Sequence, residues 1–465
     1  MNYDIIVVGS GSGGLRIAES MNKSGFKVLL IDKYEDSMGG DNVNYGSIPS
    51  NALIHISRLV HAAQQATYFG LKEEGKIDWK RVTDYITQKK NIIREHEHAD
   101  YFRKQGIDVE IGSVRFVSPD TIEVSEKIHS AKKIILAPGS TSTIPNIKGI
   151  EIVHYLTNET IFNLEELPEN VVVIGGGPRG VEFAQAFRRL GSNVTLVQRR
   201  PHFLPRESPE IADILMKQLL LEGVKLMFNT TPVEFSSPHE LLVQEKNGKK
   251  SVLPFNALLV CTGRALAIDG LGLEKAGIQK EGENIKVNEY CQTTNKQVYV
   301  CGDATGAYLY TQAAELHADI IMNNFFSPKK LKCSYDTFSW VTFTDPEIAT
   351  FGLNAIELNR RGIPYKTIRV EFSEDDRAIV DNYTNGLLLL YVSKNKIIGG
   401  SMIGRNAGEL AQELILANAC GLPLNAFFHK IYPYPTGSRV NKKAFAKHVE
   451  SQLTPIKKRL LKMMY

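Results

Sequence analysis

IIVVGSGSGGLRIAESM, Ile5 to Met21, is the stretch that decides the fold of this chain. Its apolar start, Ile5 to Val8, is typical of a buried parallel strand. Gly9, Gly11 and Gly14 then follow the spacing G-x-G-x-x-G, and a helical pattern comes next. In this context the glycines permit a tight turn and the close approach of a pyrophosphate, and the helix N-terminus supplies free N–H groups. We therefore predict a dinucleotide site; a glycine-rich turn without a ligand is the alternative.

An acidic residue and a second copy of the pattern extend this prediction. The next predicted strand, Lys27 to Ile31, ends at Asp32, whose carboxylate can accept hydrogen bonds from a ribose diol. The pattern recurs in VVVIGGGPRGVEFAQAF, which carries Gly175, Gly177 and Gly180 between a predicted strand and a helix. The sequence therefore predicts an α/β fold with two Rossmann-like nucleotide-binding units.

The second unit differs from the first at the acidic position. Asp32 lies 18 positions after Gly14, and the same offset from Gly180 falls on Gln198, followed by Arg199 and Arg200. A carboxylate there would repel a 2′-phosphate, whereas arginine binds one through charge-assisted hydrogen bonds worth about 1.5–3 kcal/mol each. We expect a preference for NADPH over NADH, with NAD as a possible second coenzyme; a solvated basic turn is the alternative interpretation.

Composition excludes several other classes of protein. The chain has 465 residues, 43% of them hydrophobic, and its net charge of +4 is too small to indicate a nucleic-acid partner. No window approaches the roughly 20 apolar residues of a membrane span, so no stable membrane insertion is expected. None of the five cysteines has Cys-x-x-Cys spacing, so spacing indicates no metal site and no local disulfide. A cytoplasmic location is expected.

Further landmarks carry a family resemblance. They follow one another along the whole chain: IILAPGS (134–140), LLVCTGR (258–264), VYVCGDATG (298–306) and FTDPEIATFG (343–352). With the two glycine turns, they resemble the pyridine nucleotide–disulfide oxidoreductases, a family of homodimeric flavoenzymes. The resemblance implies FAD and NADP as cofactors. It also implies an FAD domain in two pieces (1–150 and 280–335), an NAD(P) domain (151–279) and a C-terminal α+β dimerisation domain (336–465).

The resemblance also assigns binding residues. Asp303 matches the family aspartate that bonds the flavin's ribityl chain. The full set expected to contact the two cofactors is Gly9, Gly11, Ser12, Gly13, Gly14, Asp32, Lys33, Gly40, Asp41, Gly139, Asp303, Gly175, Gly177, Gly180, Arg199, Arg200 and Gly263.

One stretch departs from the family. The pattern Gly-Gly-Thr-Cys-Val-Asn-x-Gly-Cys-Ile-Pro-Ser-Lys corresponds here to GGDNVNYGSIPSN, in which Asn42 and Ser47 replace the two redox cysteines. Asn51 replaces the flavin-proximal lysine, while its partner glutamate is kept as Glu182. Neither an amide nor an unactivated hydroxyl can form a disulfide. The sequence therefore predicts that dithiol–disulfide exchange is lost.

The C-terminal motif also lacks residues that the family uses in disulfide chemistry. The family's His-Pro-Thr-x-x-Glu, which reaches the partner subunit's disulfide, corresponds to Tyr434-Pro-Thr-x-x-Arg439. A tyrosine, with a reference pKa near 10, is a poor base at neutral pH but a usable proton donor. Tyr434, Ser47, Asn42, Asn51 and Glu182 are therefore the candidate catalytic residues.

These observations predict an FAD-dependent NAD(P)H oxidoreductase without a redox disulfide. Its acceptor would be a small molecule: a quinone, a dye, oxygen or a second nucleotide, as in diaphorases and transhydrogenases. The alternative is a catalytically lapsed flavoprotein that serves as a nucleotide-responsive binding protein or sensor.

Overall fold

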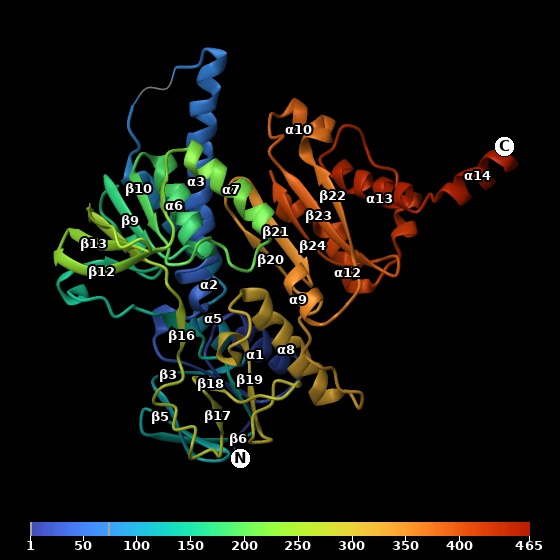
Figure 1. Cartoon of the computed structure of the whole chain (residues 1–465). Coiled ribbons are helices and arrows are strands. Elements are labelled where there is room, and N and C mark those ends of the chain that lie inside the picture. The colour runs from blue at the N-terminus through green and yellow to red at the C-terminus, as the bar shows by residue number, and fades with distance from the viewer. Residues whose placement is uncertain (1, 73–74) are drawn as a thin grey trace.

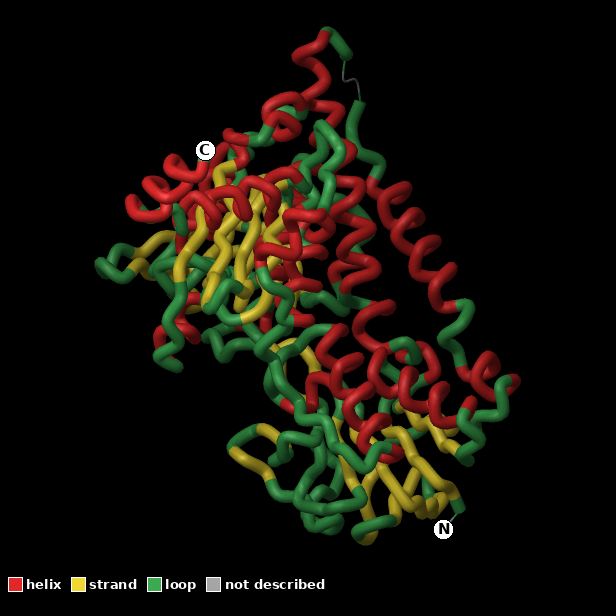
Figure 2. The backbone as a smooth tube through the Cα atoms, turned by 90° about the vertical axis from the view of Figure 1, so that its right-hand side faces the viewer, coloured by secondary structure: helices red, strands yellow, loops and turns green. Residues whose placement is uncertain are grey.

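A computed structural model describes residues 2–72 and 75–465 (Figure 1). Within these residues the strands form three larger sheets, of seven, five and five strands, and three small ones. Figure 2 shows the helices gathered around and between the sheets. In the described part, no helix has both the length and the apolar character needed to cross a membrane.

The first sheet contains the N-terminal glycine turn. Its order is β3-β2-β1-β6-β5-β4, with β19 paired to β6, although more than 160 residues separate β6 from β19. Its strands are β1 Tyr3–Val8, β2 Val28–Asp32, β3 Asp108–Ile111, β4 Val114–Ser118, β5 Thr121–Val124, β6 Lys127–Leu136 and β19 Val298–Val300. β1 pairs in parallel with β2 and β6, as the buried apolar run predicts.

Both faces of β1 are buried, which explains its continuous apolar sequence. Ile5 and Val7 pack in the cluster that holds helices α1 (Ser12–Lys23) and α8 (Thr311–Phe326). Ile6 and Val8 pack on the opposite face with the antiparallel strands β4 and β5. Successive strand residues point to opposite faces, so covering both faces requires four consecutive apolar residues. α1 and α8 lie side by side in Figure 1.

The second sheet repeats the first unit. Its order is β11-β10-β9-β15-β8, all parallel: β8 Tyr155–Leu156, β9 Asn170–Ile174, β10 Asn193–Val197, β11 Lys225–Met227 and β15 Ala257–Val260. Helices α6 (Pro178–Leu190) and α7 (Pro209–Leu221) connect its strands. A small antiparallel sheet lies beside it, made of β12 Thr230–Ser237, β13 Glu240–Glu245 and β14 Lys250–Pro254.

The third large sheet is antiparallel and C-terminal. Its order is β20-β21-β24-β23-β22: β20 Ser339–Thr342, β21 Glu347–Gly352, β22 Lys366–Glu371, β23 Leu387–Ser393 and β24 Lys396–Gly404. Its helices are α9 Ala355–Arg360, α10 Asp376–Val380, α11 Ala407–Leu410, α12 Gln412–Cys420 and α13 Arg439–Ser451. The last helix, α14 (Pro455–Met464), extends away from this sheet and buries none of its residues (Figure 1).

The connections between the first two sheets position the candidate site. Helix α3 (Ser47–Ala66) packs against α6 and α4 (Trp79–Arg94), so it joins the two nucleotide units. The landmarks IILAPGS and LLVCTGR are strand-to-glycine crossings, in which a strand is followed closely by a glycine. They pair with each other through β7 (Ser140–Ser142) and β16 (Arg264–Leu266). The remaining elements are short: α2 Gly40–Asn44, α5 Ala99–Lys104, β17 Lys280–Glu281 and β18 Asn284–Ile285.

Candidate active site

The first glycine turn is built as the sequence spacing predicts. Gly9 has φ +101°, and a Cβ there would lie 2.1 Å from the carbonyl oxygen of Ala137. A Cβ on Gly14 would lie 2.0 Å from the Gly9 oxygen, so this position also requires glycine. At Gly11 the nearest atom to an added Cβ is 3.9 Å away, on Gly40, which leaves its surface open. The two crowded glycines shape the turn, and the open one leaves room for a phosphate.

The second turn has the same three-part construction. Gly175 has φ +111°, and its Cβ would lie 2.4 Å from the oxygen of Cys261. A Cβ on Gly180 would lie 2.0 Å from the Gly175 oxygen, whereas Gly177 has open space around it. Both turns lead directly into a helix N-terminus, so each presents free N–H groups toward its open glycine.

Asp32, the acidic residue of the first unit, lies beside the first glycine turn. Asp32 is the last residue of β2, which begins and ends one residue later than predicted. Its carboxylate accepts hydrogen bonds from the Ser10 backbone N–H, at 2.9 Å, and from the hydroxyls of Ser10 and Ser37. Lys33, next in the chain, is exposed. The half-buried carboxylate is therefore held in place at the end of the strand, where a ribose can reach it.

In the second unit, the position that corresponds to Asp32 is occupied by Gln198, whose side chain ends in an amide. Gln198 donates from Nε2 to the His202 oxygen at 3.2 Å and lies beside Gly176 of the glycine turn. Arg199 and Arg200 follow it and are exposed. Arg206, further along this segment, lies with its guanidinium 4.8 Å from the ring centre of Tyr308. Two exposed guanidinium groups thus stand beside the position of the missing acid.

A charged network, which sequence reasoning did not find, joins the two units. Arg179, in the first turn of α6, donates to Asp41 at 2.7 Å, and Asn158 donates to the other carboxylate oxygen at 3.0 Å. The guanidinium of Arg264 lies 3.5 Å from Asp41 and 3.6 Å from Asp303. Arg264 therefore brings two predicted cofactor residues together, although they are remote in sequence. The sequence offers one sign of this: Arg264 directly follows a predicted strand-to-glycine crossing.

The side chain of Arg264 is mostly buried, and only some of its N–H groups form hydrogen bonds with described residues. It donates to the Ser140 hydroxyl at 2.5 Å and to the Ser140 carbonyl at 2.6 Å, and Ser140 also hydrogen-bonds Asp303. Its Nη1 is buried and has no hydrogen-bond partner within the described ranges. Burial lowers the pKa of the guanidinium, and the nearby carboxylates offset part of that effect. A buried N–H group without a partner is costly, so it indicates where a ligand acceptor belongs.

Among the remaining predicted cofactor residues, some have open space around them and one is buried in the packing between helices. Ser12 begins α1 beside the open side of the turn. Gly13 is buried instead, and its Cβ would lie 2.4 Å from the Cys301 sulfur, so it serves packing of α1 on α8. Gly139 and Gly263 lie at the two crossings, with nothing within 4 Å of an added Cβ. Two bound dinucleotides fit this arrangement: Gly11 and Gly177 leave room for phosphates, Asp32 can accept from a ribose, and Arg264 has an N–H group that is free within the described residues.

The stretch that departs from the family pattern, residues 39–51, contains α2 and the start of α3. A Cβ on Gly40, at the start of α2, would lie 2.6 Å from the Gly11 Cα, so these backbones touch. Asn42 is half-buried on α2, and Ser47 is exposed at the start of α3. Asn51 lies one turn further along α3 and donates from Nδ2 to the Ser47 carbonyl at 2.9 Å. The polar side chains at positions 42, 47 and 51 thus lie on α2, which touches the first glycine turn, and on the first turns of α3, which packs against α2.

Glu182 is a buried carboxyl on α6. Its Oε1 accepts the backbone N–H of Phe343 at 2.7 Å. Burial raises its pKa to about 7, and the Phe343 N–H and the charges of Arg179 and Arg58 lower it only in part. Within the described residues it forms no ion pair closer than 4.0 Å, and Asn51 brings no positive charge to it. Glu182 is therefore set up to hold a proton near neutral pH.

Tyr434 does not join this group within one chain. Its side chain is 68% exposed, and the guanidinium of Arg439 lies 5.0 Å from the centre of its ring. In the described residues no hydrogen bond links Tyr434 to Asn42 or Ser47. The arginine lies over the ring, where it makes a cation–π contact. Any contact between Tyr434 and the divergent stretch must therefore come from a second subunit.

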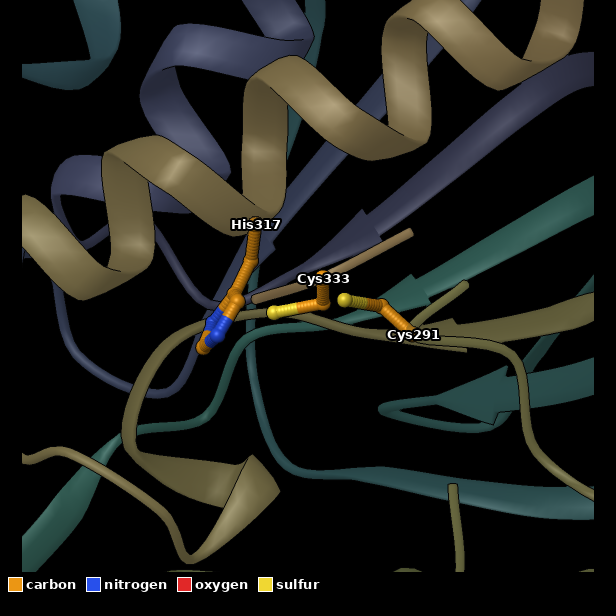
Figure 3. A group of neighbouring side chains, drawn as sticks. All are labelled: Cys291, His317 and Cys333. Atoms are coloured by element: carbon orange, nitrogen blue, oxygen red, sulfur yellow. The ribbon is translucent and has the colours of Figure 1, made fainter. Parts of the chain in front are cut away.

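A separate cluster, absent from the sequence predictions, consists of Cys291, His317 and Cys333 (Figure 3). The sulfur atoms and a ring nitrogen all lie within 4.8 Å of one another. The three residues come from different segments, so local spacing gave no sign of them.

Comparison with known proteins agrees with this geometry. The family model for pyridine nucleotide-disulphide oxidoreductases matches residues 3–318, and the model for the dimerisation domain of these enzymes matches residues 338–445. Mercuric reductase from Lysinibacillus sphaericus is 31% identical over 444 residues, which cover 94% of this chain and 80% of that protein. Dihydrolipoyl dehydrogenase from Thermus scotoductus is 32% identical over 445 residues, which cover 93% and 95% of the two chains.

A solved structure has the same overall arrangement. The Cu(II) complex of the HOCl-induced flavoprotein disulfide reductase RclA from Escherichia coli matches with a TM-score of 0.84 and 25% identity, over 96% of this chain and 99% of that one. The fold is thus confirmed: two Rossmann-like domains for FAD and NAD(P), and a C-terminal dimerisation domain that indicates a homodimer. The chain belongs to the pyridine nucleotide-disulphide oxidoreductase family, whose members bind FAD and NAD(P)H.

Proposed function

We propose that this protein is an FAD-dependent oxidoreductase that takes electrons from NADPH and passes them directly to a small non-disulfide acceptor, of the quinone or second-nucleotide class. The observation that carries the proposal is the pair Asn42 and Ser47: Asn42 lies on α2, which touches the first glycine turn, and Ser47 begins α3, which packs against α2. Neither side chain can form a thiolate or a disulfide. When bound, the flavin would supply the chemistry that accepts hydride from NADPH and releases electrons to the acceptor.

The two glycine turns support the nucleotide-dependent part of the proposal. Both keep an open middle glycine at a helix N-terminus, Gly11 in one and Gly177 in the other. The Asp41–Arg179 ion pair links the two units between these turns, at 2.7 Å. A protein that only served as a scaffold would have no need of two such open turns.

The coenzyme preference is proposed from the second unit. Arg199 and Arg200 are exposed beside Gln198, where a carboxylate would favour NADH. One or two arginine–phosphate hydrogen bonds, at about 1.5–3 kcal/mol each, correspond to roughly tenfold to several-hundredfold selectivity for NADPH.

The acceptor pocket is proposed to be lined by hydrogen-bond donors. In this arrangement Tyr434 of the partner subunit faces Asn42 and Ser47, and all three side chains can donate hydrogen bonds. Such donors stabilise negative charge that develops on a quinone oxygen, and a neutral tyrosine can add a proton. The alternative is that Tyr434 fills space in the pocket and that acceptors bind on the nicotinamide side.

The test is an acceptor screen with a matched cysteine variant. The protein as isolated and the double variant Asn42→Cys/Ser47→Cys are assayed with NADPH and NADH against a quinone and against disulfides such as lipoamide. We expect NADPH-dependent quinone reduction by the unmodified protein and no disulfide reduction. Disulfide reduction by the unmodified protein would overturn the direct-acceptor proposal, and failure of NADPH to bleach the flavin would support the lapsed-enzyme alternative.

A further inference from the structure

The cluster of Cys291, His317 and Cys333 lies apart from the residues that the proposed function uses. Figure 3 shows the Cys333 sulfur directed toward the His317 ring, with the Cys291 sulfur next to it. Cys291 comes from the turn before β19, His317 from α8, and Cys333 from the segment between α8 and β20. Cys291 and His317 are buried, whereas Cys333 is partly exposed. Cys333 is therefore the more exposed residue of the pair, and Cys291 is the buried one.

The backbone fixes both cysteines. Cys291 has φ +59° at the end of a turn whose first residue, Asn288, accepts the backbone N–H groups of Tyr290 and Gln292 on its side chain. The Cys291 carbonyl accepts the Val300 N–H at 2.8 Å, which ties the turn to β19. On the other segment the Cys333 N–H donates to the Glu289 carbonyl at 2.6 Å. The two sulfurs are thus brought together by the fold.

The hydrogen bonds of His317 determine which role the cluster can play. The backbone N–H of Gly302 donates to His317 Nδ1 at 3.1 Å, so the ring proton is placed on Nε2. Nε2 lies 2.7 Å from the hydroxyl of Tyr335. A histidine that binds a metal must offer a free lone pair, and in this arrangement neither nitrogen presents one to the sulfurs. The ring acts as a hydrogen-bond donor.

These donors favour a thiolate at Cys333. The neighbouring Cys291 thiol, the His317 ring and the Tyr335 hydroxyl lower the pKa of the Cys333 thiol, against the opposing effect of burial. The pKa of the Cys291 thiol is raised by the neighbouring Cys333 sulfur and by burial. The pair thus favours one thiolate and one thiol whose sulfurs lie within 4.8 Å of each other, which is the arrangement of a reactive cysteine and a resolving cysteine.

We propose that Cys333 and Cys291 are a peroxide-oxidised dithiol that closes to a disulfide. The Cys333 thiolate attacks one oxygen of hydrogen peroxide or an organic hydroperoxide. The O–O bond breaks, a sulfenic acid forms on Cys333, and water or an alcohol leaves after taking up a proton. The Cys291 sulfur then attacks the sulfenic sulfur, the S–S bond forms, the S–O bond breaks, and the hydroxyl leaves as water with the Cys291 proton. The two thiols lose two electrons and two protons, and the peroxide gains them.

The experiment maps cysteine oxidation in the unmodified holoprotein. The protein is reduced, freed of reductant, and treated with one equivalent of hydrogen peroxide per chain. The remaining thiols are then alkylated and the peptides are analysed by mass spectrometry without reduction. Two other cysteines serve as internal controls: Cys420 is exposed, and Cys301 is buried, with its sulfur 3.2 Å from the Ala314 carbonyl. We expect a Cys291–Cys333 cross-link, formed at least tenfold faster than oxidation at Cys420, with Cys301 unreacted.

Two variants separate the steps. Cys291→Ser removes the resolving thiol, so dimedone should trap a sulfenic acid on Cys333. Tyr335→Phe removes the hydroxyl that bonds His317 and helps to lower the pKa of the Cys333 thiol, so it should slow the first step severalfold while leaving the cross-link as the product. Absence of the cross-link in the unmodified protein, or oxidation of Cys420 at the rate of Cys333, would overturn the proposal. So would one equivalent of zinc per chain in the purified protein that is released when the pair is alkylated. The mapping of the unmodified protein decides the question even if a variant fails to fold.

Discussion

Replacing Glu182 by Gln tests the consequence of burying a carboxyl that accepts the Phe343 N–H but forms no ion pair with a described residue. The carboxyl is 8% exposed, and its pKa is raised from 4.5 to about 7. Since the folded state binds this proton more tightly than the unfolded state, the group's contribution to stability is fully present below pH 4.5. It is lost as the pH rises through 7. A shift of this size corresponds to about 3 kcal/mol.

Glutamine is neutral at every pH and keeps an oxygen that accepts the Phe343 N–H. Glu182→Gln should therefore raise the free energy of unfolding by about 3 kcal/mol at pH 8 and by less than about 1 kcal/mol at pH 5. The assay is urea unfolding of the holoprotein at both pH values. Glu281→Gln, on the exposed strand β17, is the matched control and should change neither value.

A second substitution checks the cause. Asn51→Lys places an ammonium group on α3, the helix that packs against α6, which carries Glu182. A nearby opposite charge lowers a carboxyl pKa by about 1–3 units, so the pH dependence of stability should shrink. An equal effect of Glu182→Gln at pH 5 and pH 8, or a loss of stability at pH 8, would refute the reasoning.

The remaining predictions concern the cofactors and the acceptor. The purified protein should be yellow, with about one noncovalent FAD per chain, and an absorption spectrum checks this. Arg199→Glu should raise the KM for NADPH by tenfold or more and leave that for NADH unchanged or lower; better kcat/KM with NADH in the unmodified protein would contradict the NADPH preference. Tyr434→Phe should leave flavin reduction by NADPH unchanged and slow reoxidation by quinone about 10²-fold or more; reoxidation at the parent rate for every acceptor would make Tyr434 a packing residue.

The repeating part of the fold was predictable because its signals are local. The apolar run, the glycine spacing and the terminal acid of the first unit lie within Ile5 to Asp32, and each has a direct steric or electrostatic reason. The strand predicted at Lys27–Ile31 is present, but it begins and ends one residue later, at Val28–Asp32. Strand ends are set by the pairing partner, so local patterns place them less well.

The contacts that were not predictable join residues far apart in sequence. Arg264 links Asp41 to Asp303 only because β7 and β16 pair and bring the two crossings together. Cys291 and Cys333 meet because the segment after α8 runs back to the turn before β19, where the Cys333 N–H donates to the Glu289 carbonyl. Neither contact leaves a spacing signal, since the intervening segments fold independently of it. The raised pKa of Glu182 likewise depends on burial, which the identity of its neighbours in sequence does not reveal.

Anaerobic reductive titration of the flavin tests the central claim most directly. With Asn42 and Ser47 in place of cysteines, two electrons per flavin should bleach its absorption completely, and no long-wavelength thiolate–flavin band should appear on the way. A disulfide between Cys291 and Cys333 would add two electrons without producing that band, so the spectrum separates the two cases. Uptake of four electrons per flavin, with a long-wavelength band at the two-electron stage, would contradict direct transfer from the flavin to the acceptor.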